Sequence, residues 1–569
     1  MSQQDIISEV VEDAAAVLAP EVDLVAEFDM ASFGGSLFAV LNRALEHPGE
    51  VAAAGFRFCA TLVKIAQFTA SRSAGQDMAP PIPPGKDKRF ADRSWEDNPA
   101  FAGLRQAYLA FRQFSEDMLA AGSGDPVSDG KARLMSGFLL DAVAPTNFLA
   151  TNPAALKRAF ETGGGSLVAG ARNFLDDLVH NDGRPSQVDR RPFRLGENLA
   201  ATPGKIVYRS ELMELIQYAP QTPEVGAIPM LMSPAWINKY YIMDLAPGRS
   251  FIEWAVQHGH TVFAISYRNP DERMRGVRLD DYLIEGPRTA LDVISDITGA
   301  DKINITGLCL GGALTAMLAA YLVKTGDDRL GSITLLNTLL DYSEPGVLGV
   351  FTDERTVARM EQHMQAKGFL EASDMRTAFD MLRANDLIFS YVATNWLMGQ
   401  RPPAFDILAW NADSTRMPAA MHSFYLRSLY LHNELARGEM ELAGQQLSLK
   451  DIKADTYVVS AVNDHIVPWT ASYKTTGLLG GQVRYLLSNG GHIAGIVNPP
   501  GPKAWHEVSE DSHLSPEQWR AGAELIQGSW WEDWASWAKQ RAGETVQPPK
   551  LGSRRYPAIG DAPGEYIHG

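Results

Sequence analysis

The chain has 569 residues, 45% of them apolar, with a formal net charge of −17 and a pI near 5.2. This length exceeds what one hydrophobic core usually organises, so we expect two domains or one domain with a large insertion. The acidic balance argues against nucleic-acid binding, which normally needs a concentrated basic surface.

The first twenty residues carry no targeting pattern. MSQQDIISEVVEDAAAVLAP is acidic and lacks the basic start and apolar core of a secretory signal. No apolar run approaches the roughly 20 residues that cross a bilayer. We therefore expect a cytoplasmic protein without a transmembrane segment. Its two cysteines, Cys59 and Cys309, lie far apart, which argues against a disulfide framework.

Residues 1–190 are predicted to form a helical N-terminal domain. The first 75 residues are Ala-rich with helix-like spacing, and FAGLRQAYLAFRQF at 101–114 places apolar residues at i, i+3, i+4 and i+7. Between them a proline-rich linker is expected at 76–86, because each proline fixes φ and removes a backbone donor. Cys59 falls in this domain and is expected to be a buried apolar thiol.

Residues 191–569 alternate strand-like and helix-like segments, which predicts an α/β domain with a mostly parallel sheet covered on both faces. The strands are expected at 228–232, 261–267, 302–306, 333–339, 456–462 and 483–487. Helices are expected at 250–258, 279–298 and 313–324.

A helical, aromatic-rich stretch interrupts this alternation at about 341–450. An insertion between sheet strands lies above the strand ends, where such folds bind ligands. We therefore expect a cap over the active site, with an additional packing subdomain as the alternative.

The strand at 302–306 runs directly into Gly307-Leu308-Cys309-Leu310-Gly311-Gly312, and a helix-forming segment follows. This is the GxSxG elbow pattern of the α/β-hydrolase fold with cysteine in place of serine. The sharp turn forces the nucleophile into an unfavourable backbone conformation, so glycine is needed two residues before and two after it. The pattern predicts Cys309 as a nucleophile at a helix N-terminus, where thiolate is favoured.

In this fold the order along the chain is nucleophile, acid, histidine. Asp464 follows the strand at 456–462, and His492 follows the strand at 483–487. We expect His492 to take the Cys309 proton and Asp464 to orient His492. His465 competes for the base role, but adjacent Asp464 and His465 side chains diverge, so a supporting role is expected for it.

An oxyanion on the attacked carbonyl needs two donors. The N–H of Leu310 is one candidate. The second is the N–H of Ile237 or Trp236, in the loop after the strand at 228–232. Asn238 and Asp244, in the segment that follows, are expected to contact and position the catalytic residues.

At this point the sequence resembles the polyhydroxyalkanoate synthase family, and the matching stretches cover most of the chain from residue 87. They are DKRFADRSWEDNPAF at 87–101, PTNFLATNP at 145–153, INKYYIMDL at 237–245, GLCLGG at 307–312, RANDLIFSYV at 383–392, NDHIVPW at 463–469 and GGHIAGIVNPP at 490–500.

The resemblance implies Cys309 as nucleophile, Asp464 as orienter and His492 as base, in agreement with the pattern above. It also implies a cap domain, an active homodimer and residence on polyester granules with their associated proteins. The segments at 281–307 and 410–418 look closest to class I, which favours short-chain monomers such as 3-hydroxybutyryl-CoA. No metal or other cofactor is expected. Coenzyme A is part of the substrate and is released as a product, so it is not counted as a cofactor.

The predicted reaction is polymerisation of (R)-3-hydroxyacyl-CoA into polyester. A cysteine thioester keeps the acyl group activated while coenzyme A leaves, and its transfer to a hydroxyl is then downhill. Two alternatives stay open. One is a cysteine-dependent hydrolase of the same fold, such as an acyl thioesterase, and the other is a non-catalytic granule-binding protein.

Overall fold

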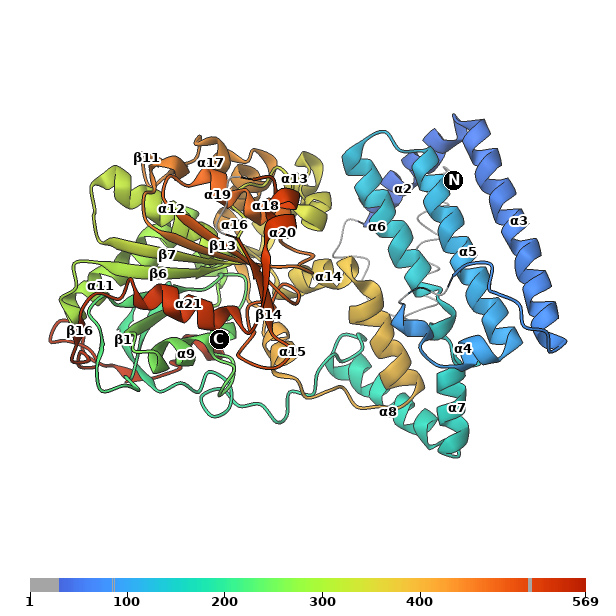
Figure 1. Ribbon diagram of the computed structural model, residues 1–569, viewed down its shortest axis with the longest axis horizontal. Coiled ribbons are helices and arrows are strands. Elements are labelled where there is room, and N and C mark those ends of the chain that lie inside the picture. Colours follow the sequence, from blue (N-terminus) through green and yellow to red (C-terminus); the bar gives the residue numbers. More distant parts are fainter. Residues whose placement is uncertain (1–29, 84, 86, 510–513) are drawn as a thin grey trace. The chain divides into compact units, whose positions relative to one another are not determined.

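The structure is a computed structural model that describes residues 30–83, 85, 87–509 and 514–569 (Figure 1). The chain divides into two compact units. The first comprises Met1–Asp189 and Ser373–Ala404, and the second comprises Arg190–Ala372 and Phe405–Gly569.

The first unit is helical. Its helices are α2 (Met30–Leu45), α3 (Pro48–Ser73), α4 (Ser94–Asp97), α5 (Pro99–Ala121), α6 (Pro126–Ala142), α7 (Pro153–Glu161) and α8 (Gly165–His180), with α14 (Ala372–Leu382) and the π-helical turns η8 (Asn385–Phe389) and η9 (Val392–Leu397) from later in the chain.

Three of these helices, α5, α6 and α7, begin with an Asn or Asp cap followed by proline. Asn98, Asp125 and Asn152 each cap a helix by accepting a backbone N–H, and each is followed by a proline at the first helical position. The missing N–H of proline is not needed there, so the pair starts a helix efficiently. No helix or strand occurs in the described residues between Ala74 and Asp87, where the linker was expected.

Helix α3 is long and apolar, and it buries few of its residues. By length and composition alone it could cross a bilayer, but a single helix of this kind is weak evidence of a membrane span. The prediction that Cys59 is buried was wrong: its thiol is exposed. The physical reason is that α3 buries only one narrow side, through Ala54, Ile65 and Phe68.

The segment Ser373–Ala404 lies within the range expected for the cap, yet it belongs to the N-terminal unit. Trp396 donates from Nε1 to Asp177 Oδ2 at 2.8 Å and packs edge-on against Phe174. Gly170 allows this approach, since a Cβ there would lie 1.9 Å from the Trp396 carbonyl oxygen. The remaining parts of 341–450 belong to the second unit.

The second unit is built on an eleven-stranded sheet with the order β15-β14-β13-β12-β7-β6-β4-β5-β2-β1-β17. Its strands are β1 (Gly204–Arg209), β2 (Met213–Tyr218), β4 (Met230–Ser233), β5 (Val262–Tyr267), β6 (Ile303–Leu308), β7 (Leu330–Leu336), β12 (Thr456–Ala461), β13 (Val483–Ser488), β14 (Trp505–Val508), β15 (Glu524–Gln527) and β17 (Gly560–Asp561).

The centre of this sheet is parallel: β5, β4, β6, β7, β12 and β13 pair in that order, all in one direction. These six strands are the six predicted from the sequence. The strands on either side pair antiparallel and were not predicted. Two-stranded pairs lie outside the main sheet: β3 (Val225–Gly226) with β16 (Thr545–Val546), β8 (Phe369–Leu370) with β9 (Met417–Pro418), and β10 (Glu441–Leu442) with β11 (Gln445–Gln446).

Helices cover both faces, with α12 on one side and α9 and α21 on the other (Figure 1). Phe251 of α9 stacks among Trp530, Trp531 and Trp534 of α21. The helices of this unit are α9 (Phe251–Gln257), α10 (Leu279–Leu283), α11 (Thr289–Thr298), α12 (Leu310–Thr325), α13 (Glu354–Lys367), α15 (Asp406–Asn411), α16 (Ala419–Tyr425), α17 (Glu434–Arg437), α18 (Trp469–Tyr473), α19 (Thr475–Leu478), α20 (Pro516–Gly522) and α21 (Trp530–Lys539).

Candidate active site

Cys309 lies at the turn between central strand β6 and helix α12. Its φ of 52° and ψ of −115° fall in a region that L residues rarely adopt. The expected strained elbow is therefore present. Its backbone N–H donates to the Leu336 carbonyl at 2.8 Å, which ties the elbow to neighbouring strand β7.

The flanking glycines are required by close packing. A Cβ on Gly307 would lie 2.5 Å from the Cα of Gly312, and one on Gly311 would lie 2.2 Å from the Ser233 carbonyl oxygen. A Cβ on Gly312 would lie 1.9 Å from Thr338 Oγ1. Any side chain at these positions would push apart the segments that form the elbow.

The predicted oxyanion donors lie at the start of α12 and in the loop after β4. Leu310 is the first residue of α12, so its N–H has no acceptor within its own helix. The close approach of Gly311 to Ser233 and Pro234 places the loop after β4 against the start of α12. Trp236 and Ile237 form the turn of that loop, and Trp236 is buried.

His492 and Asp464 meet across adjacent strand ends. Asp464 follows β12 and His492 follows β13, and the distance between His492 Nδ1 and Asp464 Oδ2 is 2.7 Å. The second carboxylate oxygen accepts the N–H groups of Ile466 at 2.8 Å and Val467 at 2.9 Å. The Asp464 side chain is fully buried, so both oxygens are held in place.

The His492 ring also lies close enough to the Cys309 side chain for the two groups to interact electrostatically. Burial opposes a charge on this imidazole, but Asp464 and then Cys309 outweigh burial and raise the pKa of His492 from its ordinary value near 6.5 to about 10. Because a raised pKa favours the imidazolium, the pair is set to move a proton from the thiol to His492. The structure thus brings the three predicted residues together in one chain of contacts.

Three tyrosines surround Cys309 closely enough for their charges to interact, and the sequence analysis did not single them out. Tyr342, Tyr425 and Tyr430 are held well above their usual pKa, first by burial and also by Cys309. Tyr430 packs against Tyr342 and Tyr425, with ring centroids 4.8 Å and 5.5 Å apart. All three come from the range expected for the cap, whose aromatic richness was the available signal.

His465, Asn238 and Asp244 are the remaining predicted site residues. His465 follows Asp464 in the same turn, and the ring that bonds Asp464 is that of His492. Asn238 accepts the Lys239 N–H with its own Oδ1. Asp244 is buried, which raises its pKa to about 6, and it accepts hydrogen bonds from Thr202, Ser250 and Tyr218.

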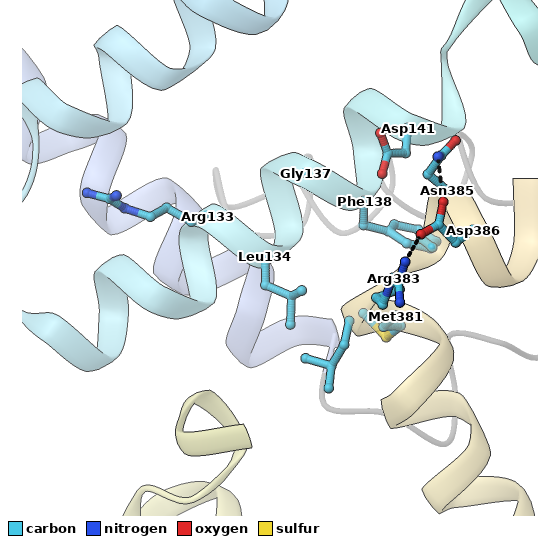
Figure 2. A pocket seen from close by; sticks show the side chains of 11 residues that line it. Arg133, Leu134, Gly137, Phe138, Asp141, Met381, Arg383, Asn385 and Asp386 are labelled. Atoms are coloured by element: carbon cyan, nitrogen blue, oxygen red, sulfur yellow. Dashed lines mark hydrogen bonds and ion pairs between the residues drawn. The ribbon is translucent and has the colours of Figure 1, made fainter. Parts of the chain in front are cut away.

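A separate pocket lies in the N-terminal unit, between α6 and the segment that joins α14 to η8 (Figure 2). Its walls carry both charged and apolar side chains, and Arg383 is paired there with Asp386. The lining residues are Arg133, Leu134, Gly137, Phe138, Asp141, Met381, Leu382, Arg383, Ala384, Asn385 and Asp386. This pocket contains none of the predicted site residues.

Comparison with known proteins decides the family. The model described as poly-beta-hydroxybutyrate polymerase (PhaC) N-terminus matches residues 86–255, and the alpha/beta hydrolase fold model matches 234–499. A poly(3-hydroxyalkanoate) polymerase of Methylorubrum extorquens is 40% identical over 556 residues, 97% of this chain and 92% of that protein. The chain belongs to the poly(3-hydroxyalkanoate) polymerase family.

Other poly(3-hydroxyalkanoate) polymerases agree. The polymerase subunit of Cupriavidus necator is 41% identical, covering 85% of this chain and 83% of its own. Polymerase 1 of Ectopseudomonas oleovorans is 40% identical, covering 85% and 87%. Among solved structures, mouse alpha/beta hydrolase domain-containing protein 10 aligns with a TM-score of 0.29 at 15% identity, over 51% of this chain and 90% of its own. The predictions of an enzyme, of this family and of the α/β-hydrolase fold are confirmed.

Proposed function

We propose that this polymerase joins (R)-3-hydroxyacyl units from their coenzyme A thioesters through an acyl chain bound to Cys309. The observation that carries the proposal is the contact chain Cys309, His492 and Asp464 at a strained elbow. The geometry supplies a nucleophile, a base and an orienter in one place.

In the first step His492 takes the thiol proton, and the Cys309 sulfur attacks the thioester carbonyl. The bond from the carbonyl carbon to the coenzyme A sulfur breaks, and coenzyme A leaves with the proton returned by His492. One thioester replaces another, so the acyl group stays activated. The N–H groups of Leu310 and Ile237 (or Trp236) are the proposed donors to the oxyanion.

In the second step His492 takes the proton of a 3-hydroxyl, whose oxygen attacks the Cys309 thioester. A C–O ester bond forms, the C–S bond breaks, and His492 returns the proton to the sulfur, which regenerates the Cys309 thiol. Water must be excluded, because hydrolysis would end the chain. Buried Tyr342 and Tyr425, together with partly buried Tyr430, supply an aromatic wall for this purpose. These steps use side chains and backbone groups alone, so no metal or added cofactor is included.

Exposed apolar side chains of the N-terminal unit support attachment to the surface of polyester granules, and the proposed location of the protein is the cytoplasm. On α3, Phe56 is 77% exposed and Val63 is 57% exposed, one heptad apart. On α8, Val168 and Val179 are exposed beside Leu175. Contiguous exposed apolar patches mark interaction surfaces. An active homodimer, granule-associated protein partners and a class I preference for short-chain monomers such as 3-hydroxybutyryl-CoA complete the proposal.

The test is incubation with 3-hydroxybutyryl-CoA, with free thiol release and insoluble polyester followed together. We expect both to rise in parallel. Release of coenzyme A with free 3-hydroxy acid and no polyester would instead identify a cysteine-dependent thioesterase. Light scattering across a dilution series, with activity measured on each species, tests the homodimer. Full specific activity from a monomer would contradict it.

A further inference from the structure

The order of strands in the sheet places His492 and Cys309 after strands that are not neighbours. Strand β13, which delivers His492, is separated from elbow strand β6 by β12 and β7. Neighbouring strands are about 4.8 Å apart, so about 14 Å separates the axes of β13 and β6. The loop after β13 must therefore cross the ends of β12 and β7 before His492 can meet Cys309. Its backbone needs an anchor near the end of β7.

Asn337 occupies that place. It directly follows β7, and its side-chain Nδ2 donates to the main-chain carbonyl of His492. Its own N–H donates to the Val459 carbonyl of β12 at 2.8 Å. The preceding residue, Leu336, accepts the N–H of Cys309. One dipeptide thus contacts the elbow, the strand that leads to Asp464, and the backbone of His492.

The conformation of Asn337 is unfavourable in two respects. Its φ of 42° lies in the left-handed region, which few residues other than glycine and asparagine tolerate. Its Oδ1 is buried and has no hydrogen-bond partner among the described residues. The amide cannot turn over to improve this, because Oδ1 would then face the His492 carbonyl oxygen. Such costs persist where the surroundings impose them, and they concentrate at functional sites.

We propose that Asn337 is a positioning residue, which anchors the His492 backbone over the end of β7 so that the imidazole reaches Cys309. Asp464 sets the rotation of the ring, and Asn337 sets where its backbone lies. This inference rests on the proposed function, because it assumes that His492 takes the Cys309 proton.

The test uses two substitutions in a Cys59→Ser background, since Cys59 is exposed and would otherwise react with thiol reagents. Asn337→Gly removes the amide and tolerates the positive φ. Asn337→Asp keeps the size but replaces the donor with an oxygen. Asn304→Ala is the matched control. Asn304 is also buried and bonds the Arg541 carbonyl from Nδ2, but it lies at the opposite end of β6.

We expect Asn337→Gly to lower kcat about 10- to 100-fold with little change in KM, as displacement of a catalytic group by about 1 Å does. The pH dependence of the rate at which iodoacetamide alkylates Cys309 should also shift to higher pH, because the thiol loses its proton acceptor. Asn337→Asp should also lower kcat and shift the alkylation profile, because an ionised carboxyl has no proton to donate to the His492 carbonyl.

Asn304→Ala should lower the melting temperature without changing the alkylation profile. The proposal would be overturned if folded Asn337→Gly had the kcat and the pH profile of Cys309 alkylation of the wild-type protein. It would also be overturned if the alkylation profile of Asn337→Gly did not differ from that of Asn304→Ala. If Asn337→Gly fails to fold, Asn337→Asp decides on the same two readouts. Failure of the proposed function would be seen separately, as the absence of an acyl adduct on Cys309 of the parent protein.

Discussion

Asp464 Oδ2 lies 2.7 Å from His492 Nδ1, although 28 residues separate them along the chain. Parallel pairing of β12 with β13 brings both residues to the same edge of the sheet, because each follows the carboxyl end of its strand. The second Asp464 oxygen is occupied by two backbone N–H groups. This carboxylate therefore holds the ring in one tautomer and leaves Nε2 for the sulfur.

We expect Asp464→Asn to impair turnover less than His492→Ala. An orienter can be replaced in part by packing, whereas a base in direct proton transfer cannot. In serine-nucleophile triads the corresponding losses in kcat are on the order of 10⁴-fold and 10⁶-fold. Steady-state kinetics of coenzyme A release measure both. His465→Ala is the comparison, and a loss as large as that of His492→Ala would show that the base is assigned to the wrong histidine.

The raised pKa of His492 predicts a pH dependence of stability. Its folded-state pKa, about 10, exceeds the unfolded value near 6.5, so the imidazolium is favoured by folding. This contribution is fully present below pH 6.5 and is lost as the pH rises toward 10. The free energy of unfolding should therefore fall across this range in urea titrations. His492→Gln should flatten the slope, and an unchanged slope in that variant would contradict the assignment.

The elbow glycines give a paired prediction. A Cβ on Gly312 meets the Thr338 side chain, whereas a Cβ on Gly311 meets the Ser233 and Pro234 backbone. Each alanine substitution should cost about 1–3 kcal/mol or more through overpacking. Thr338→Ala should partly restore Gly312→Ala, since it removes the obstructing hydroxyl and methyl groups. Thr338→Ala should not restore Gly311→Ala. Thermal unfolding of the two glycine variants, of Thr338→Ala and of the two double variants tests this, and equal rescue of both glycine variants would contradict the packing described.

The sequence predicted the elements whose pattern depends on local chemistry. Six parallel strands, the strained elbow at Cys309 and the order of Asp464 and His492 could all be predicted, because strand ends and glycine spacing constrain them. The outer strands β14, β15 and β17 could not, since they have four residues or fewer and carry little periodicity. The outer strands β1 and β2 have six residues each and were also missed. Asn337 could not be predicted either, because its role depends on which strands are neighbours in space.

The boundaries of the cap also depend on tertiary contacts that the sequence pattern does not reveal. The aromatic-rich range at 341–450 looks uniform in the sequence, yet Ser373–Ala404 packs with the N-terminal unit. What decides this is a tertiary contact, in which Gly170 makes room for the Trp396 backbone. No periodicity within the segment reports that contact.

The most direct measurement concerns Cys309→Ser. Serine fits the elbow and keeps both proposed oxyanion donors, so folding should be nearly unchanged. Slow acylation would give an oxygen ester, and its transfer to a 3-hydroxyl lacks the driving force and good leaving group of a thioester. Mass spectrometry after addition of 3-hydroxybutyryl-CoA, together with a polymer assay, should show an acylated protein or slow release of free acid, with no polyester accumulating. Sustained polyester formation by Cys309→Ser would contradict the covalent thioester account.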